Sequence, residues 1–79
     1  MKVLVGIVVE PRLLEEVCEM LSKVEEVVEV YEVTGEYDVF AEIEVASVEA
    51  FRALLKEDVL AMPGVKLTES SVVLGVWKE

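Results

Sequence analysis

The sequence predicts a small α+β fold, in which one antiparallel sheet carries its helices on a single face. Three observations support this prediction. The chain has 79 residues, a length that suits one domain. Its apolar residues alternate between the period of two typical of strands and the period of about 3.6 typical of helices. Pro11, Gly35 and Pro63-Gly64 stand where the period changes.

The first third of the chain predicts a strand followed by a helix. The apolar, β-branched run Val3 to Val9 is typical of a strand buried on both faces. Gly6 is unexpected there, because glycine weakens a strand unless something must approach closely. Pro11 suits the first turn of a helix, which we expect to run from Pro11 to Val24. Its apolar positions have helical spacing: Leu14, Val17, Cys18, Leu21 and Val24.

The remainder predicts a hairpin, a second helix and a last strand. Val27 to Thr34 and Tyr37 to Val45 are β-rich runs joined at Gly35, a pattern typical of an antiparallel hairpin. One face of the second run is expected to hold Tyr37, Val39, Ala41, Ile43 and Val45. Ser47 is expected to cap a helix that Pro63-Gly64 ends. Val65 to Trp77 then predicts the last strand.

This order of elements favours a ferredoxin-like βαββαβ sandwich, with a four-stranded antiparallel sheet and two helices on one face. The first and last strands are apolar on both sides, so the uncovered face would be a large exposed apolar patch. Hydrophobic residues make up 54% of the sequence, which is high for so small a domain. We therefore expect the sheet to dock on a second copy, with Gly6 and Gly75 allowing close approach.

Charge and composition exclude several classes of partner. The formal net charge of −10 argues against direct nucleic-acid binding and against an anionic membrane surface. Cys18 is the only cysteine, so no intramolecular disulfide is possible. No apolar stretch approaches the roughly 20 residues of a membrane helix, and we expect a cytoplasmic protein. An excess of Glu and Val is also typical of thermophile proteins.

The residue types argue against catalysis, metals and cofactors. The chain has no histidine, the commonest general base and metal ligand. Cys18 lies on the inner stripe of a helix and is expected to be a core residue rather than a nucleophile. The glycines are too far apart for a phosphate-binding loop, and the acidic runs lack the spacing of a metal-binding loop.

The segment Val33 to Val39 allows two interpretations. In the structural one, which the residues alone favour, Gly35 serves the turn, Tyr37 packs and Asp38 is a polar hairpin residue. In the functional one, Asp38 or Glu36 receives the ammonium group of an amino acid, and donors nearby receive its carboxylate. These donors would be the backbone at Gly35 and the hydroxyls of Thr34, Thr68 or Ser70.

The segments VTGEYDVFAEIEV (33–45) and MPGVKLTESSVVL (62–74) resemble the effector domain of the Lrp/AsnC transcriptional regulators. The resemblance covers essentially the whole chain, including the opening VLVGIVVEPR (3–12). Its most specific parts are Thr34-Gly35-Glu36-Tyr37-Asp38, Pro63-Gly64-Val65 and Thr68-Glu69-Ser70, where a serine replaces the second threonine of the family's Thr-x-Thr.

The resemblance implies a ferredoxin-like fold, dimers formed through the sheet, octameric or similar rings, and amino-acid effectors bound between dimers. By position, the family's ligand contacts fall on Gly35, Tyr37, Asp38, Thr68 and Ser70. Family members usually carry an N-terminal helix-turn-helix domain, and residues 1–79 show none, so we expect a stand-alone effector-binding module. Such a module either senses an amino acid alone or co-assembles with full-length regulators.

Two other functions stay open. A structural adaptor that has lost its ligand would form mixed oligomers without responding to any amino acid. A small enzyme built on a ferredoxin-like dimer would need a histidine or a polar cluster inside the barrel, and the sequence offers neither.

Overall fold

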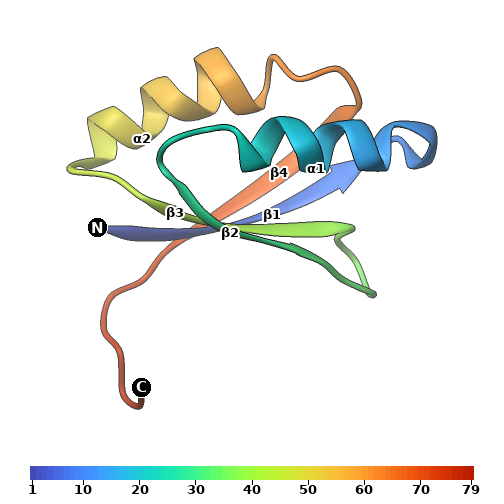
Figure 1. Ribbon diagram of the computed structural model, residues 1–79. Coiled ribbons are helices and arrows are strands. Elements are labelled where there is room, and N and C mark those ends of the chain that lie inside the picture. Colours follow the sequence, from blue (N-terminus) through green and yellow to red (C-terminus); the bar gives the residue numbers. More distant parts are fainter.

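A computed structural model describes residues 1–79 and shows the predicted alternation of strands and helices (Figure 1). The elements are β1 (Lys2–Val9), η1 (Pro11–Leu13, a 3₁₀ turn), α1 (Leu14–Ser22), β2 (Val27–Glu32), β3 (Val39–Glu44), α2 (Val48–Leu54), η2 (Leu55–Val59, a π-helical turn) and β4 (Val65–Val72).

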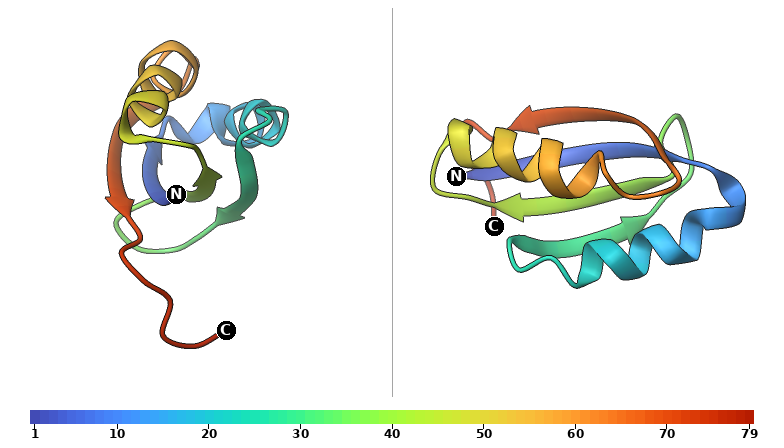
Figure 2. Two further views of the ribbon diagram at one scale, coloured as in Figure 1. Left: turned by 90° about the vertical axis from the view of Figure 1, so that its left-hand side faces the viewer. Right: turned by 90° about the horizontal axis from the view of Figure 1, so that it is seen from above.

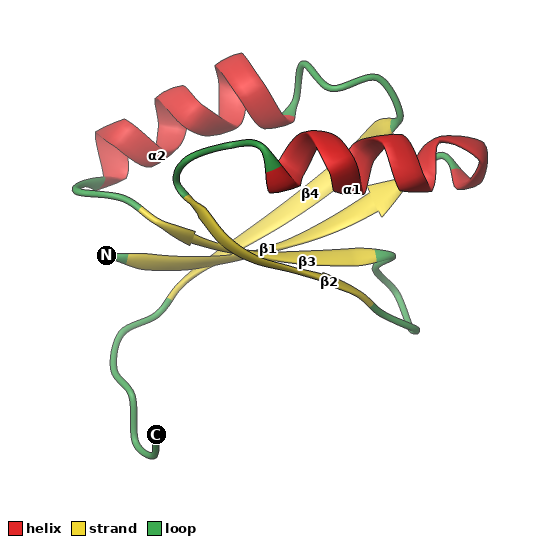
Figure 3. Cartoon of the chain, in the orientation of Figure 1, coloured by secondary structure: helices red, strands yellow, loops and turns green.

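The four strands form one antiparallel sheet in the order β2-β3-β1-β4. Both helices lie on the same face of this sheet, so the molecule has two layers (Figures 1 and 3). The predicted ferredoxin-like fold is therefore confirmed. Neither helix has the length and apolar composition that a membrane-spanning helix requires.

The core lies between the sheet and the helices. Val3, Val5 and Ile7 of β1 are fully buried and pair with Ile43, Ala41 and Val39 of β3, which are fully buried as well. Side chains of the helical layer close this core from above: Val17, Leu21, Phe51, Leu54 and Val59. Because successive strand residues face opposite sides, Leu4 of β1 points away from the helices and is 39% exposed.

The helices begin as the sequence predicts but are not regular to their ends. Pro11 opens the 3₁₀ turn η1 before α1 starts at Leu14, and α1 ends at Ser22 rather than Val24. The Ser47 hydroxyl accepts a hydrogen bond from the Ala50 N–H at 3.1 Å and caps α2. The last turn of this helix, η2, widens to a π-helical turn, with the Leu60 N–H donating to the Leu55 carbonyl.

The last strand is shorter than the predicted Val65 to Trp77, since β4 ends at Val72. The Val73 N–H still donates to the Lys2 carbonyl at 2.9 Å, but β1 begins at Lys2 and provides no backbone partner beyond it. Residues 74–79 therefore leave the sheet, and they extend on the side away from the helices (Figure 2).

The sheet surface turned away from the helices, here named the open face, has no second layer. Its apolar residues are Leu4, Val8, Tyr31, Phe40 and Leu67. Tyr31 is 48% exposed and Leu67 is 59% exposed. The predicted apolar patch is therefore present, although carboxylates interrupt it at Glu42 and Glu69.

Gly64 and Gly35 both have positive φ angles, of 100° and 111°, but differ in their surroundings. A Cβ at Gly64 would lie 2.8 Å from Cβ of Leu13, whereas a Cβ at Gly35 would meet nothing within 4 Å.

We predict that Gly64→Ala lowers the free energy of unfolding by about 2–4 kcal/mol, from backbone strain and overpacking together. Gly35→Ala, the matched control, should cost about 1 kcal/mol from strain alone. Guanidinium unfolding measures both, and equal losses would contradict the packing contribution.

Candidate functional site

The connection between β2 and β3, residues 33–38, holds five of the seven predicted ligand residues. Two backbone hydrogen bonds of 2.9 Å fix its base, from the Val33 N–H to the Asp38 carbonyl and from the Asp38 N–H to the Ile7 carbonyl. Thr34, Gly35 and Glu36 form the exposed tip, with no further hydrogen bond in the chain. The connection therefore has a fixed base and a free polar tip.

Asp38 serves the base of this connection. Its Oδ2 accepts a hydrogen bond from the backbone N–H of Val9 at 2.8 Å. Strand β3 begins at Val39, opposite Ile7, so no β3 residue lies opposite Val9. The carboxylate takes the place of the missing strand carbonyl, because a buried N–H without a partner is costly. Asp38 thus has a structural role, with one oxygen already engaged.

Tyr37 lies across the open face rather than on the face of Val39. A Cβ at Gly6 would come 2.9 Å from Cγ of Tyr37, so the ring rests directly on the glycine. The ring also meets Phe40 edge to face, with centroids 5.5 Å apart. The predicted placement of Tyr37 beside Val39 is wrong, because the alternation of the strand does not extend past Asp38 into the connection.

Gly6 therefore accommodates a side chain of its own chain. The expectation that Gly6 allows close approach of a second copy is wrong at this point, since the Tyr37 ring fills the space above it. The phenol hydroxyl continues across β1 and donates a hydrogen bond to Glu69 of β4 at 2.6 Å. This hydrogen bond is the main cause that raises the pKa of Tyr37. Tyr37 thus links the β2–β3 connection to the far edge strand of the sheet.

Thr68 and Ser70 lie on the other side of the sheet. They pair with Ile7 and Val5, whose side chains face the helices, whereas Glu69 pairs with Gly6 on the open face. Ser70 is exposed and Thr68 is half-buried, because the helical layer does not fully cover β4. Within one chain, the connection and the β4 hydroxyls are separated by β1 and do not form a common pocket.

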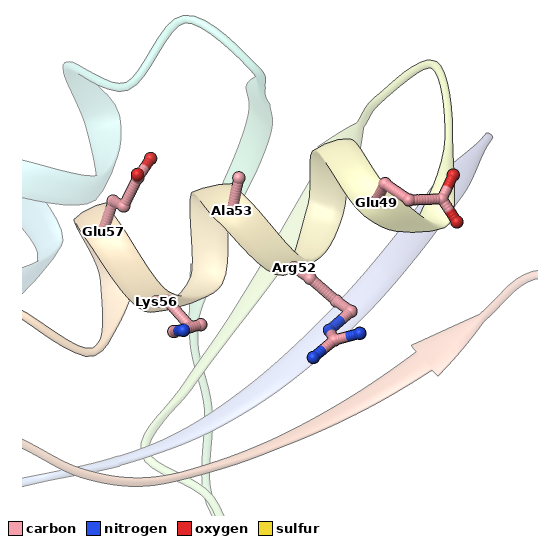
Figure 4. Close-up of a pocket in the computed structure, with 5 residues that line it drawn as sticks. All are labelled: Glu49, Arg52, Ala53, Lys56 and Glu57. Atoms are coloured by element: carbon pink, nitrogen blue, oxygen red, sulfur yellow. The ribbon is translucent and has the colours of Figure 1, made fainter.

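The surface has one shallow pocket, of about 300 Å³, along α2 and its π-helical turn. Figure 4 shows Arg52 and Lys56 pointing to one side of the helix and Glu57 to the other. None of the seven predicted ligand residues lines it: the lining residues are Glu49, Arg52, Ala53, Lys56 and Glu57. No group of three or more acidic or cysteine side chains is placed to hold a metal ion.

Cys18 packs partly buried against the core, as the helical stripe predicts. Burial raises the pKa of its thiol, and the negative charge of Glu32 adds to the effect. A raised pKa disfavours the thiolate, which is the reactive form. Cys18 is therefore a packing residue.

Comparison with known proteins identifies relatives of the whole chain. The family described as the Lrp/AsnC ligand binding domain matches residues 2–79, which confirms the resemblance inferred from the sequence. The HTH-type transcriptional regulator FL11 of Pyrococcus abyssi is 42% identical over 65 residues, which are 81% of this chain and 42% of FL11. The chain thus spans less than half the length of this curated relative.

Solved structures agree with this family. TTHA0845 from Thermus thermophilus is 26% identical with a TM-score of 0.92, and the match covers 99% of this chain and 98% of that one. A feast or famine regulatory protein from M. tuberculosis, solved in complex with L-methionine, is also 26% identical, with a TM-score of 0.84. That match covers 99% of this chain and 52% of the regulator.

The structural role of Asp38 can be tested by comparing two neighbouring carboxylates. We predict that Asp38→Ala lowers the free energy of unfolding by about 1–3 kcal/mol, because the buried Val9 N–H loses its acceptor. Glu36→Ala, at an exposed residue without such a bond, should change it by less than about 0.5 kcal/mol. Guanidinium unfolding measures both variants. Equal stability of the two would show that the Asp38 hydrogen bond contributes nothing.

The Tyr37–Glu69 hydrogen bond predicts a pH dependence at alkaline pH. The pKa of Tyr37 is raised in the folded state, so the bond stabilises the fold at pH values below the ordinary tyrosine pKa. This stability is lost as the pH rises through the raised pKa of Tyr37. In a Tyr31→Phe background, where Tyr37 is the only tyrosine, Glu69→Gln should lower its pKa. Glu36→Gln, the control, should lower it less, since Glu36 is the smallest contribution. Ultraviolet titration of the phenolate measures the pKa, and an unchanged midpoint in Glu69→Gln would contradict the assignment.

Proposed function

The chain belongs to the Lrp/AsnC ligand-binding domain family, and on this basis we propose that it binds an amino acid or a similar small metabolite as an effector, within an assembly of several copies. The observation that carries the proposal is the match over residues 2–79 to a ligand-binding domain. The L-methionine complex of the M. tuberculosis regulator supports an amino acid as the class of ligand.

The tip of the β2–β3 connection has groups that suit a zwitterion. An ammonium group needs a carboxylate, and Glu36 is exposed and makes no ion pair. A carboxylate needs N–H or hydroxyl donors, and Thr34 and the backbone at Gly35 have no partner in the chain. Asp38 keeps one oxygen free of the Val9 N–H. Tyr37 positions this tip from the open face.

The separation of the two predicted groups favours a site shared between copies. Thr68 and Ser70 of β4 face the helix side of the sheet. The connection joins β2 to β3, and β1 lies between β3 and β4. In our proposal, an effector bridges the connection of one copy and the β4 hydroxyls of another. Effector binding then favours one arrangement of copies over others, which is how binding at an interface shifts an assembly.

The open face supports assembly. Leu4, Tyr31 and Leu67 are 39%, 48% and 59% exposed in the single chain. Exposed apolar side chains gathered on one face in this way usually mark a contact with another molecule. A second copy provides the same surface, so a two-fold contact buries both at once.

We infer two regulatory roles consistent with such a module. The relative FL11 is an HTH-type transcriptional regulator, and the chain matches only part of it. The effector-binding unit would report an amino acid either through its own assembly or through mixed assembly with full-length regulators. Its net charge of −10 opposes contact with nucleic acid, so any such contact would come from the partner regulator.

The ligand is identified by unfolding the protein in guanidinium with each of the twenty amino acids added in turn. An amino acid at a hundredfold excess over its Kd should raise the free energy of unfolding by about 2.7 kcal/mol. Glu36→Ala should remove this increase while unfolding normally without ligand, because Glu36 is exposed. Ser22→Ala, remote from the connection, is the control and should keep the full response.

No response to any of the twenty amino acids would contradict an amino acid as the effector. If sedimentation still showed an assembly, the structural adaptor would remain as the function. The hydrogen bond that engages Asp38 favours this second candidate, because it occupies one of the two carboxylate oxygens that an ammonium group could use.

A further inference from the structure

The C-terminal segment, residues 74–79, is the most apolar part of the chain that has nothing to pack against. Leu74 is 99% exposed, Val76 is 60% exposed and Trp77 is 100% exposed. A Cβ added at Gly75 would meet no atom within 4 Å, so the segment stands clear of the body. A tryptophan usually buries about 150–250 Å² of surface, and here it buries essentially none.

The direction of the segment relates it to the open face. It leaves the end of β4 and extends on the side of the sheet opposite to the helices (Figures 1 and 2). Any second copy that docks on the open face must approach from this side. Residues 74–79 reach about 20 Å when extended, whereas a four-stranded sheet is about 14 Å wide between its outer strands. The segment is therefore long enough to cross the sheet of a second copy.

The open face offers complementary groups. Leu4, Phe40 and Leu67 provide apolar contact, and Glu29 and Glu69 provide negative charge. Lys78, at the end of the segment, makes no ion pair in the chain. Glu79 follows it and balances its charge, so the segment adds no net charge to the repulsion between two copies with a net charge of −10 each.

We propose that the C-terminal segment of one copy packs across the open face of a second copy, with Trp77 buried there, and that the second copy returns the same contact. This inference rests on the proposed assembly through the open face and assigns to it residues outside the sheet. One chain supplies both the segment and the surface that receives it, so a two-fold exchange satisfies both.

Trp77 is the only tryptophan, so its fluorescence reports this contact directly. We expect its emission to shift to shorter wavelength and to become protected from acrylamide as protein concentration rises, in step with dimer formation measured by sedimentation. Trp77→Ser should raise the dimer Kd about tenfold or more, as for a central aromatic interface residue. Leu67→Glu, on the receiving face, should leave Trp77 exposed and weaken the dimer. Leu60→Glu changes a similarly exposed leucine outside the open face and is the control that should do neither.

Three results would overturn the proposal, and they separate it from the proposed assembly. A dimer in which Trp77 stays exposed, with an unchanged Kd for Trp77→Ser, refutes the segment exchange and leaves the sheet contact standing. A shift to shorter wavelength in a species that sedimentation shows to be a monomer means that the segment folds onto its own chain. A chain that stays monomeric with an exposed tryptophan refutes both the exchange and the assembly.

Discussion

Two helices can cover only one face of this four-stranded sheet, and the other features of the molecule follow from that limit. On the covered face, β1 and β3 bury aliphatic side chains completely, because helix side chains lie above each of them. On the open face, the same strands carry Leu4 and Phe40 with no layer above. The chain itself covers a single point of this face, where Tyr37 rests on Gly6. The remaining apolar surface and the exposed C-terminal segment lie on the same side, so one contact with a second copy can bury both.

The β2–β3 connection is held to the sheet by two side chains with different tasks. Asp38 completes the hydrogen bonding at the end of β1, and Tyr37 spans the open face to Glu69. The exposed tip, Thr34 to Glu36, is thereby carried on a fixed base. In the proposed function, a tip carried on a fixed base needs little ordering when an effector arrives, which lowers the entropic cost of binding. The Tyr37 side chain also connects the tip to the open face, on which a second copy is proposed to dock.

Electrostatics oppose the assembly that the apolar surface favours. Each chain has seventeen acidic and seven basic residues, and carboxylates lie within the open face. Part of this charge is compensated locally, since Nζ of Lys2 lies 3.5 Å from Oε2 of Glu42. The remainder repels across any face-to-face contact, and salt screens such repulsion between exposed groups. In the proposed assembly, apolar burial must outweigh this charge, and burial of the exposed Trp77 would contribute to it.

The order of elements, the core positions of β1 and β3 and the Ser47 cap were all predictable, because they depend on local period, capping chemistry and turn residues. The seven candidate ligand residues stay a prediction, and their arrangement in space was not predictable from the sequence. The face occupied by Tyr37, the acceptor role of Asp38 and the end of β4 at Val72 each depend on a partner distant in the sequence. Gly6 receives Tyr37, Val9 needs Asp38 and β4 ends where β1 begins. Periodicity determines which residues can be buried, whereas the register of strands far apart in the chain decides which residues meet.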